Sequence, residues 1–219
     1  MRESYREELE DITACLVEMS NSVGSAMSTA TTALLDADVA LADLVIAGDE
    51  RIDAVRESIE ERCFTLLARQ QPVATDLRTV TTAMRIVGDL ERMGDLAVHV
   101  AKLARMRFPE SAVPAEVRPI FLEAGHVAQS LVAQVGTVIA KLDVQGAARL
   151  EKDDDLMDQL HRQLFTELLS PGWPHGMESA IDITLLGRYY ERFADHAVSV
   201  ARRVVFLVTG ERDMVALPN

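Results

Sequence analysis

Apolar residues recur at spacings of three and four along almost the whole chain, and strict alternation of apolar and polar residues is nearly absent. This spacing places apolar side chains on one face of a helix, so the pattern predicts an all-α protein. Proline and glycine cluster at a few places, such as Gln71-Pro72 and Ser170–Gly176, and separate the helices. Six long helices are predicted, over about residues 4–35, 38–70, 75–107, 116–142, 145–169 and 177–209. Thr75 or Asp76 is expected to cap the third.

The predicted helices are much longer than the globular mean of about 11–12 residues, which is typical of helix bundles. They also carry an internal repeat. Segment 91–102, ERMGDLAVHVAK, recurs 100 residues later as ERFADHAVSVAR, and segment 49–55 matches 154–160 at a shift of 105 residues. We therefore predict two tandem three-helix bundles produced by internal duplication: a first unit over 1–110, a second over 115–210, and a C-terminal tail over 211–219.

Charge and composition exclude several classes of function. The chain has 22 Lys and Arg against 35 Asp and Glu, a net charge of −13, which opposes nucleic-acid binding because that contact depends on basic residues. The N-terminus is charged and lacks the apolar stretch of a secretory signal, and no apolar run approaches the ~20 residues needed to span a bilayer. A cytoplasmic protein is expected. Cys15 and Cys63 are too few for a disulfide framework and are expected to be buried free thiols.

Each predicted unit carries two pairs of carboxylates spaced four residues apart on successive helices. Glu91 and Asp95 share a helix face with apolar residues such as Val87 and Val98, and the same spacing recurs 100 residues later. The preceding helix of each unit carries its own acidic stripe, which includes Glu57 in the first unit. In an up-down-up bundle the two helices are antiparallel, so their acidic stretches are expected to lie level with one another.

Carboxylates on two facing helices, without cysteine or regularly placed histidine, are hard oxygen ligands that suit Mg²⁺, Mn²⁺ or iron. We therefore predict one polynuclear or weakly bound metal patch in each unit. The alternative is an ordinary solvated helix surface, in which Arg92 and Arg192 neutralise the acids directly.

Three motifs, in order along the chain, resemble the PhoU family. They are VIAGDERID at 45–53, QPVATDLR at 71–78, and the tandem Glu-Arg-x-x-Asp-x-Ala-Val-x-Val-Ala at 91–101 and 191–201. The resemblance covers about residues 4–209. It implies a non-enzymatic accessory protein of the Pst phosphate transporter that is often a homodimer. Such a protein negatively regulates phosphate uptake and the phosphate-starvation response by linking the transporter ATPase to the sensor histidine kinase of a two-component system. It would reach the membrane only through these partners.

The same resemblance implies metal clusters, of iron in some members and of magnesium or manganese in others. Carried onto the matching positions, the ligands are Asp49, Asp53, Glu91, Asp95, Asp154, Asp158, Glu191 and Asp195. The second unit departs from the first, with Arg162 in place of Glu57 and a loop at 170–176 in place of the QPVATDLR segment. The two sites are therefore expected to differ. The acidic chain offers no obvious anion site, so phosphate status is expected to arrive through the transporter.

A carboxylate-bridged di-iron enzyme or an iron-binding four-helix protein is the main rival. That chemistry needs a Glu-x-x-His motif on two helices. The chain has one, Glu123 with His126, and Asn21 stands at the repeat position of the histidine. His99, His126 and His161 are therefore interpreted as surface or satisfied residues. There is no glycine-rich phosphate loop and no nucleophile motif.

Overall fold

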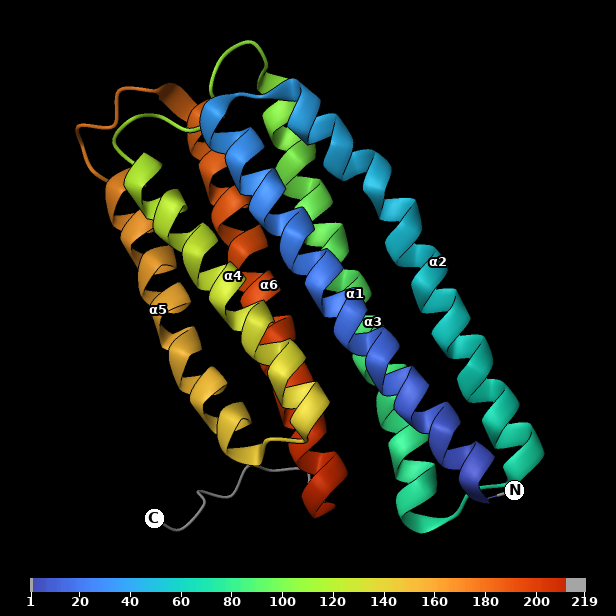
Figure 1. Cartoon of the computed structure of the whole chain (residues 1–219). Helices are drawn as coiled ribbons and strands as arrows, with labels where there is room; N and C mark the ends of the chain where they lie inside the picture. The colour runs from blue at the N-terminus through green and yellow to red at the C-terminus, as the bar shows by residue number, and fades with distance from the viewer. Residues whose placement is uncertain (1, 212–219) are drawn as a thin grey trace.

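The computed structural model describes residues 2–211, which form six long helices joined by short connections (Figure 1). No strand occurs within those residues, which confirms the all-α prediction. From residue 212 onward, the predicted tail lies outside the described residues. The helices are α1 (Arg2–Asp36), α2 (Val39–Gln70), α3 (Ala74–Arg107), α4 (Arg118–Lys141), α5 (Val144–Leu168) and α6 (Gly176–Thr209).

Two aspartates fix the start of the second helix of each unit. Asp38 accepts hydrogen bonds from the backbone N–H groups of Ala40 and Leu41 at 2.9 and 3.1 Å, and Asp143 accepts one from Gly146 at 2.8 Å. These caps satisfy N–H groups that the first helical turn leaves without a helical partner. Asp38 and Asp143 stand 105 residues apart, so the duplication extends to the way these helices begin.

The predictions for the start of α3 and for Cys15 are wrong. α3 begins after Val73, whose aliphatic side chain cannot cap it, and the N–H of Asp76 donates to the Val73 carbonyl at 3.1 Å. Thr75 and Asp76 therefore lie inside the first turn. Cys63 is a buried free thiol as predicted, whereas Cys15 is only half-buried, on a face of α1 where its sulfur accepts a hydrogen bond from Arg62 at 3.4 Å.

The two units pack side by side and share one core. Within each unit the three helices contact one another, and between the units α1 contacts α4 and α3 contacts α6. The four helices α1, α3, α4 and α6 are therefore central, while α2 and α5 flank them on opposite sides (Figure 1). The buried apolar residues of all six helices form a single cluster. None of the helices in residues 2–211 has a stretch both long and apolar enough to cross a membrane.

Small residues bring α1 and α4 close together at the boundary between the units. A Cβ added to Gly125 of α4 would lie 2.6 Å from Cγ2 of Thr31, and one added to Gly136 would lie 3.0 Å from Oγ of Ser20. The repeat shift of 105 residues takes Thr31 to Gly136 and Ser20 to Gly125. The two contacts thus occupy equivalent positions, as a pseudo-two-fold relationship between the units requires, although in both of them the first unit supplies the hydroxyl residue and the second unit supplies the glycine.

α3 and α6 are joined by two polar bridges near opposite ends of their contact. Arg107 donates from Nε and Nη2 to the carboxylate of Asp182 at 2.6 and 3.1 Å. At the other bridge, the buried carboxylate of Asp89 accepts hydrogen bonds from Arg203 and from Ser199. Charges that are buried in this way are paired because an isolated one would be strongly destabilising. Both bridges connect the first unit to the second.

Candidate metal centre

The acidic pairs of the first unit lie on α2 and α3, which pack against each other. Asp49 and Asp53 come from α2, Glu91 and Asp95 come from α3, and all four are partly buried. Gly94 allows the helices to approach closely here, since a Cβ at this position would lie 3.2 Å from Cδ1 of Ile52, with Oδ1 of Asp49 at 3.9 Å. The structure thus places the two predicted acidic stretches level with each other.

Burial and like charge raise the pKa of two of these carboxyl groups. For Asp49, burial is the largest cause, followed by the negative charges of Asp53 and Asp95. For Glu91, burial again raises the pKa most, and the charge of Asp95 adds to it. A carboxylate whose pKa is raised by neighbouring carboxylates sits in a negative potential. A bound cation would relieve that repulsion.

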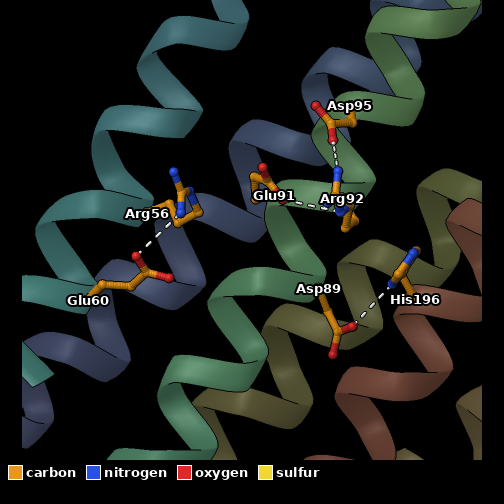
Figure 2. A network of polar contacts seen from close by, with 7 residues as sticks. All are labelled: Arg56, Glu60, Asp89, Glu91, Arg92, Asp95 and His196. Carbon is orange, nitrogen blue, oxygen red and sulfur yellow. Dashed lines mark hydrogen bonds and ion pairs between the residues drawn. The ribbon is translucent and has the colours of Figure 1, made fainter.

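Two arginines lie near the same acids (Figure 2). They neutralise part of the negative charge, as the alternative to metal binding predicts. Nη1 of Arg92 lies 2.8 Å from Oδ2 of Asp95, and its Nε lies 3.7 Å from Oε2 of Glu91. The charge of Arg56, which pairs with Glu60 at 3.3 Å, lowers the pKa of Glu91 against the effect of burial. Arg92 is 62% exposed and approaches from solvent, and exposed ion pairs of this kind are worth only about 0–1 kcal/mol.

The second unit repeats this arrangement in a more open form. Asp154 of α5 and Glu191 of α6 are partly buried, whereas Asp158 and Asp195 are exposed. Burial, followed by the charges of Asp158 and Asp195, raises the pKa of Asp154 to about 6. The carboxylates are therefore close enough to repel one another here as well, although only half of them are sheltered from water.

His161, which the sequence suggested to be a surface or satisfied residue, lies at this second site. Its Nδ1 lies 3.3 Å from Oε2 of Glu191, and its Nε2 is buried without a hydrogen-bond partner. Arg188 also pairs with Glu191. His161 stands 105 residues after Arg56, so each unit places one basic side chain opposite its glutamate. The repeat shift alone would have revealed this position. Arg192, predicted as the neutralising partner in this unit, makes no ion pair among the side chains of residues 5–211.

The donor chemistry of both sites fits a hard cation, although the side chains are not gathered around a single point. In the part of the chain that the structure describes, no group of three or more His, Cys, Asp or Glu side chains is close enough to hold an ion as they lie. Carboxylate oxygens are nevertheless the ligands that Mg²⁺ and Mn²⁺ prefer. Binding would require rotation of these partly exposed side chains and displacement of Arg92 and Arg188.

The Glu-x-x-His motif of the rival interpretation lies elsewhere. Glu123 and His126 are on α4 with side chains that are 52% and 63% exposed, and His126 Nδ1 lies 3.7 Å from Glu123 Oε2. A di-iron site of the four-helix type needs these side chains to project into the bundle interior. The Glu-x-x-His motif on α4 therefore does not provide a histidine ligand for the acidic sites, and the arrangement does not match a di-iron site of this type.

Comparisons with known proteins agree with this duplicated architecture. The model of the PhoU domain matches the chain twice, over residues 16–104 and 121–204. The phosphate-specific transport system accessory protein PhoU homolog 2 of Mycobacterium tuberculosis is 50% identical over 210 residues, which are 96% of this chain and 99% of that protein.

Two solved structures are similar over almost the whole chain. PhoU from Pseudomonas aeruginosa has a TM-score of 0.85 at 31% identity and covers 94% of this chain and 100% of its own. The phosphate transport system regulatory protein PhoU from Streptococcus pneumoniae has a TM-score of 0.86 at 26% identity, over 96% of this chain and 100% of its own. With both helical units matched and half of the residues shared with a relative over nearly its full length, the chain belongs to the PhoU family.

Proposed function

We propose that this protein is a non-enzymatic regulator and adaptor of phosphate homeostasis. The observation that carries the proposal is its likeness, over nearly the full length, to accessory proteins of the phosphate-specific transport system. In this role it associates with the Pst phosphate-transporter ATPase and with a phosphate-sensing histidine kinase of a two-component system. It thereby lowers phosphate uptake and keeps the starvation response off when phosphate is plentiful.

The shape and charge of the molecule suit an adaptor. A rigid bundle of helices between 24 and 35 residues long offers extended faces for helix-on-helix contacts. The net charge of −13 favours basic surfaces on its partners, because complementary charge speeds association and suppresses wrong partners. We place the protein in the cytoplasm as a homodimer that reaches the membrane through its partners.

We further propose that each unit binds Mg²⁺, Mn²⁺ or iron, as a single ion or a multinuclear cluster, through its four acids: Asp49, Asp53, Glu91 and Asp95 in the first unit, and Asp154, Asp158, Glu191 and Asp195 in the second. The support is electrostatic, since burial and like charge raise the pKa of an acid in both units. A cation there would remove repulsion between the second and third helix of the unit. The first site is expected to bind more tightly, because all four of its acids are partly buried.

Deletion of the gene in its own host tests the regulatory role. A reporter of phosphate-starvation genes is expected to be active at high phosphate in the deletion strain and silent again after complementation. A reporter that stays silent in the deletion strain would contradict the proposal.

Elemental analysis tests the metal sites separately. The purified protein is expected to retain metal that Glu91→Ala/Asp95→Ala reduces. Glu123→Ala/His126→Ala, which changes exposed residues on α4, serves as the matched control and is expected to leave the metal content unchanged. Equal metal content in all three proteins would show that these acids form an ordinary solvated helix surface and do not bind metal.

A further inference from the structure

A small pocket lies between α3 and α6, near the end of α6 and away from the acidic sites. Its volume is about 280 Å³. Its walls are three arginines, a serine and a phenylalanine, namely Arg85, Ser199, Arg202, Arg203 and Phe206. Such a concentration of guanidinium groups is unexpected in a chain with a net charge of −13. The negative net charge of the whole chain, which led us to expect no anion site, conceals this local excess of arginine.

Two of the three lining arginines are paired with acids, and one is not. Arg203 donates from Nε to Asp89, and Arg202 donates to Glu151. Arg85, which also lines the pocket, has no acidic partner among the side chains of residues 5–211. Its charge is therefore not compensated by an ion pair.

A fourth arginine stands beside the pocket. The guanidinium carbon of Arg78 lies 5.9 Å from the centroid of the Phe206 ring, and its Nε is buried without a hydrogen-bond partner. Like Arg85, it forms no ion pair with a described acid. The pocket and its rim thus hold four arginines against the two acids Asp89 and Glu151, a local excess of two positive charges.

The contacts with Asp89 also hold the pocket in shape. The carboxylate of Asp89 is buried and accepts hydrogen bonds from both Ser199 and Arg203. Arg203 makes this contact through Nε alone. Its two terminal nitrogens make no hydrogen bond to any described residue. Arg203 is therefore pre-oriented, and donors remain available for a further acceptor.

The duplication does not account for this pocket. The equivalent positions of the repeat are Leu185, His99, Lys102, Leu103 and Met106. No guanidinium group stands among them, so the arginine-lined pocket is not repeated at the equivalent positions. The duplication thus does not explain this cluster, and a specific ligand explains it better than a helix-surface charge that both units would share.

We propose that this pocket binds a phosphate group, carried by inorganic phosphate or by a small phosphate monoester. A planar guanidinium matches phosphate oxygens with two parallel hydrogen bonds, which makes arginine the favoured phosphate ligand. An excess of two positive charges balances a phosphate dianion, and the volume suits a small anion. The inference goes beyond the adaptor role, which stands whether or not the pocket binds phosphate.

Isothermal titration calorimetry on the purified full chain tests the proposal. Metal is first removed with a chelator, so that phosphate cannot bind through an ion at the acidic sites. Inorganic phosphate and adenosine monophosphate are titrated separately at constant ionic strength, with chloride as the reference anion. We expect saturable binding of at least one of them at one site per chain. Tighter binding of the nucleotide would identify a monoester as the ligand, and equal or weaker binding would identify inorganic phosphate.

Arg85→Gln and Arg78→Gln are expected to weaken this binding at least tenfold, because each removes a charge-assisted hydrogen bond. Arg51→Gln is the matched control, since Arg51 is exposed on α2, a helix that makes no contact with α6 within the described residues. Circular dichroism checks that every variant is folded. Absence of saturable binding, or an equal loss in Arg51→Gln and Arg85→Gln, would overturn the proposal.

Discussion

Asp89 of α3 and His196 of α6 meet between the two units, with Nδ1 of His196 3.1 Å from Oδ1 of Asp89 (Figure 2). The Asp89 side chain is only 9% exposed, and it also receives the guanidinium of Arg203. Leu96 stands at the repeat position of His196, so the first unit has no copy of this contact. One of the polar bridges between the units is thus a buried charge that α3 supplies and α6 neutralises.

Asp89→Asn is expected to lower the free energy of unfolding by about 3–5 kcal/mol, because it removes the buried counter-charge of the Arg203 guanidinium. Urea denaturation measures the change. Asp43→Asn is the control, since Asp43 pairs with Arg105 at 3.1 Å on the surface and should cost less than about 1 kcal/mol. Similar losses in the two variants would show that the bridge contributes no more than a surface pair.

The same carboxylate predicts a response to acid. Burial opposes ionisation of Asp89, but the hydrogen bonds from His196 and Arg203 outweigh it, so the pKa of Asp89 lies below its ordinary value. The unfolded chain therefore takes up the proton first, and stability falls as the pH drops below the ordinary aspartate value of about 4. Thermal melts between pH 3 and pH 6 should show a smaller fall for Asp89→Asn than for the wild type. Parallel curves would contradict the assignment.

Glycine at the α1–α4 contact is expected to be required for close packing. Gly125→Ala should destabilise the protein by about 1–3 kcal/mol, because the new Cβ would lie 2.6 Å from Cγ2 of Thr31. Gly88→Ala in α3 is the matched control. Its Cβ would meet nothing within 4 Å, so the better helix propensity of alanine should stabilise the protein by up to about 1 kcal/mol. If both variants were stabilised, the two units would not be packed as closely as the structure places them.

The sequence predicted the helices and the duplication because both are local or periodic properties. Apolar spacing, prolines and caps such as Asp38 determine where a helix runs, and the repeat at 91–102 and 191–202 needs no knowledge of packing. The level placement of Glu91 and Asp95 opposite Asp49 and Asp53 followed from antiparallel neighbours in a short-looped bundle.

The contacts between helices of different units were not predictable in this way. That α3 packs on α6 and α1 on α4 depends on helix rotation and crossing, which a 3.6-residue period does not specify. No role was therefore predicted for Asp89, Arg85 or Arg203, because their contacts are with residues more than 100 positions away in the sequence. His161 was missed because a single histidine carries no pattern until the repeat aligns it with Arg56.

Metal is expected to stabilise the chain through its carboxylates. At a metal concentration of 100 times Kd, one site contributes about 2.7 kcal/mol to the free energy of unfolding. Mn²⁺ or Mg²⁺ should therefore raise the Tm of the chelator-treated protein. This increase in Tm should be reduced more by Asp49→Asn/Asp95→Asn than by Asp158→Asn/Asp195→Asn, because Asp158 and Asp195 are exposed. Without metal, Asp49→Asn/Asp95→Asn should melt no lower than the wild type, because it relieves repulsion. A metal response that is equal in all three proteins would argue against these sites.

The adaptor role is tested most directly by the binding of the purified chain to the phosphate-transporter ATPase and to the sensor kinase of its own host, with detergent-solubilised membranes as the source of both. We expect the immobilised chain to capture at least one of them, saturably and in preference to an immobilised unrelated helical bundle of similar negative charge. Capture of neither partner, with metal present and after chelation, would contradict the account.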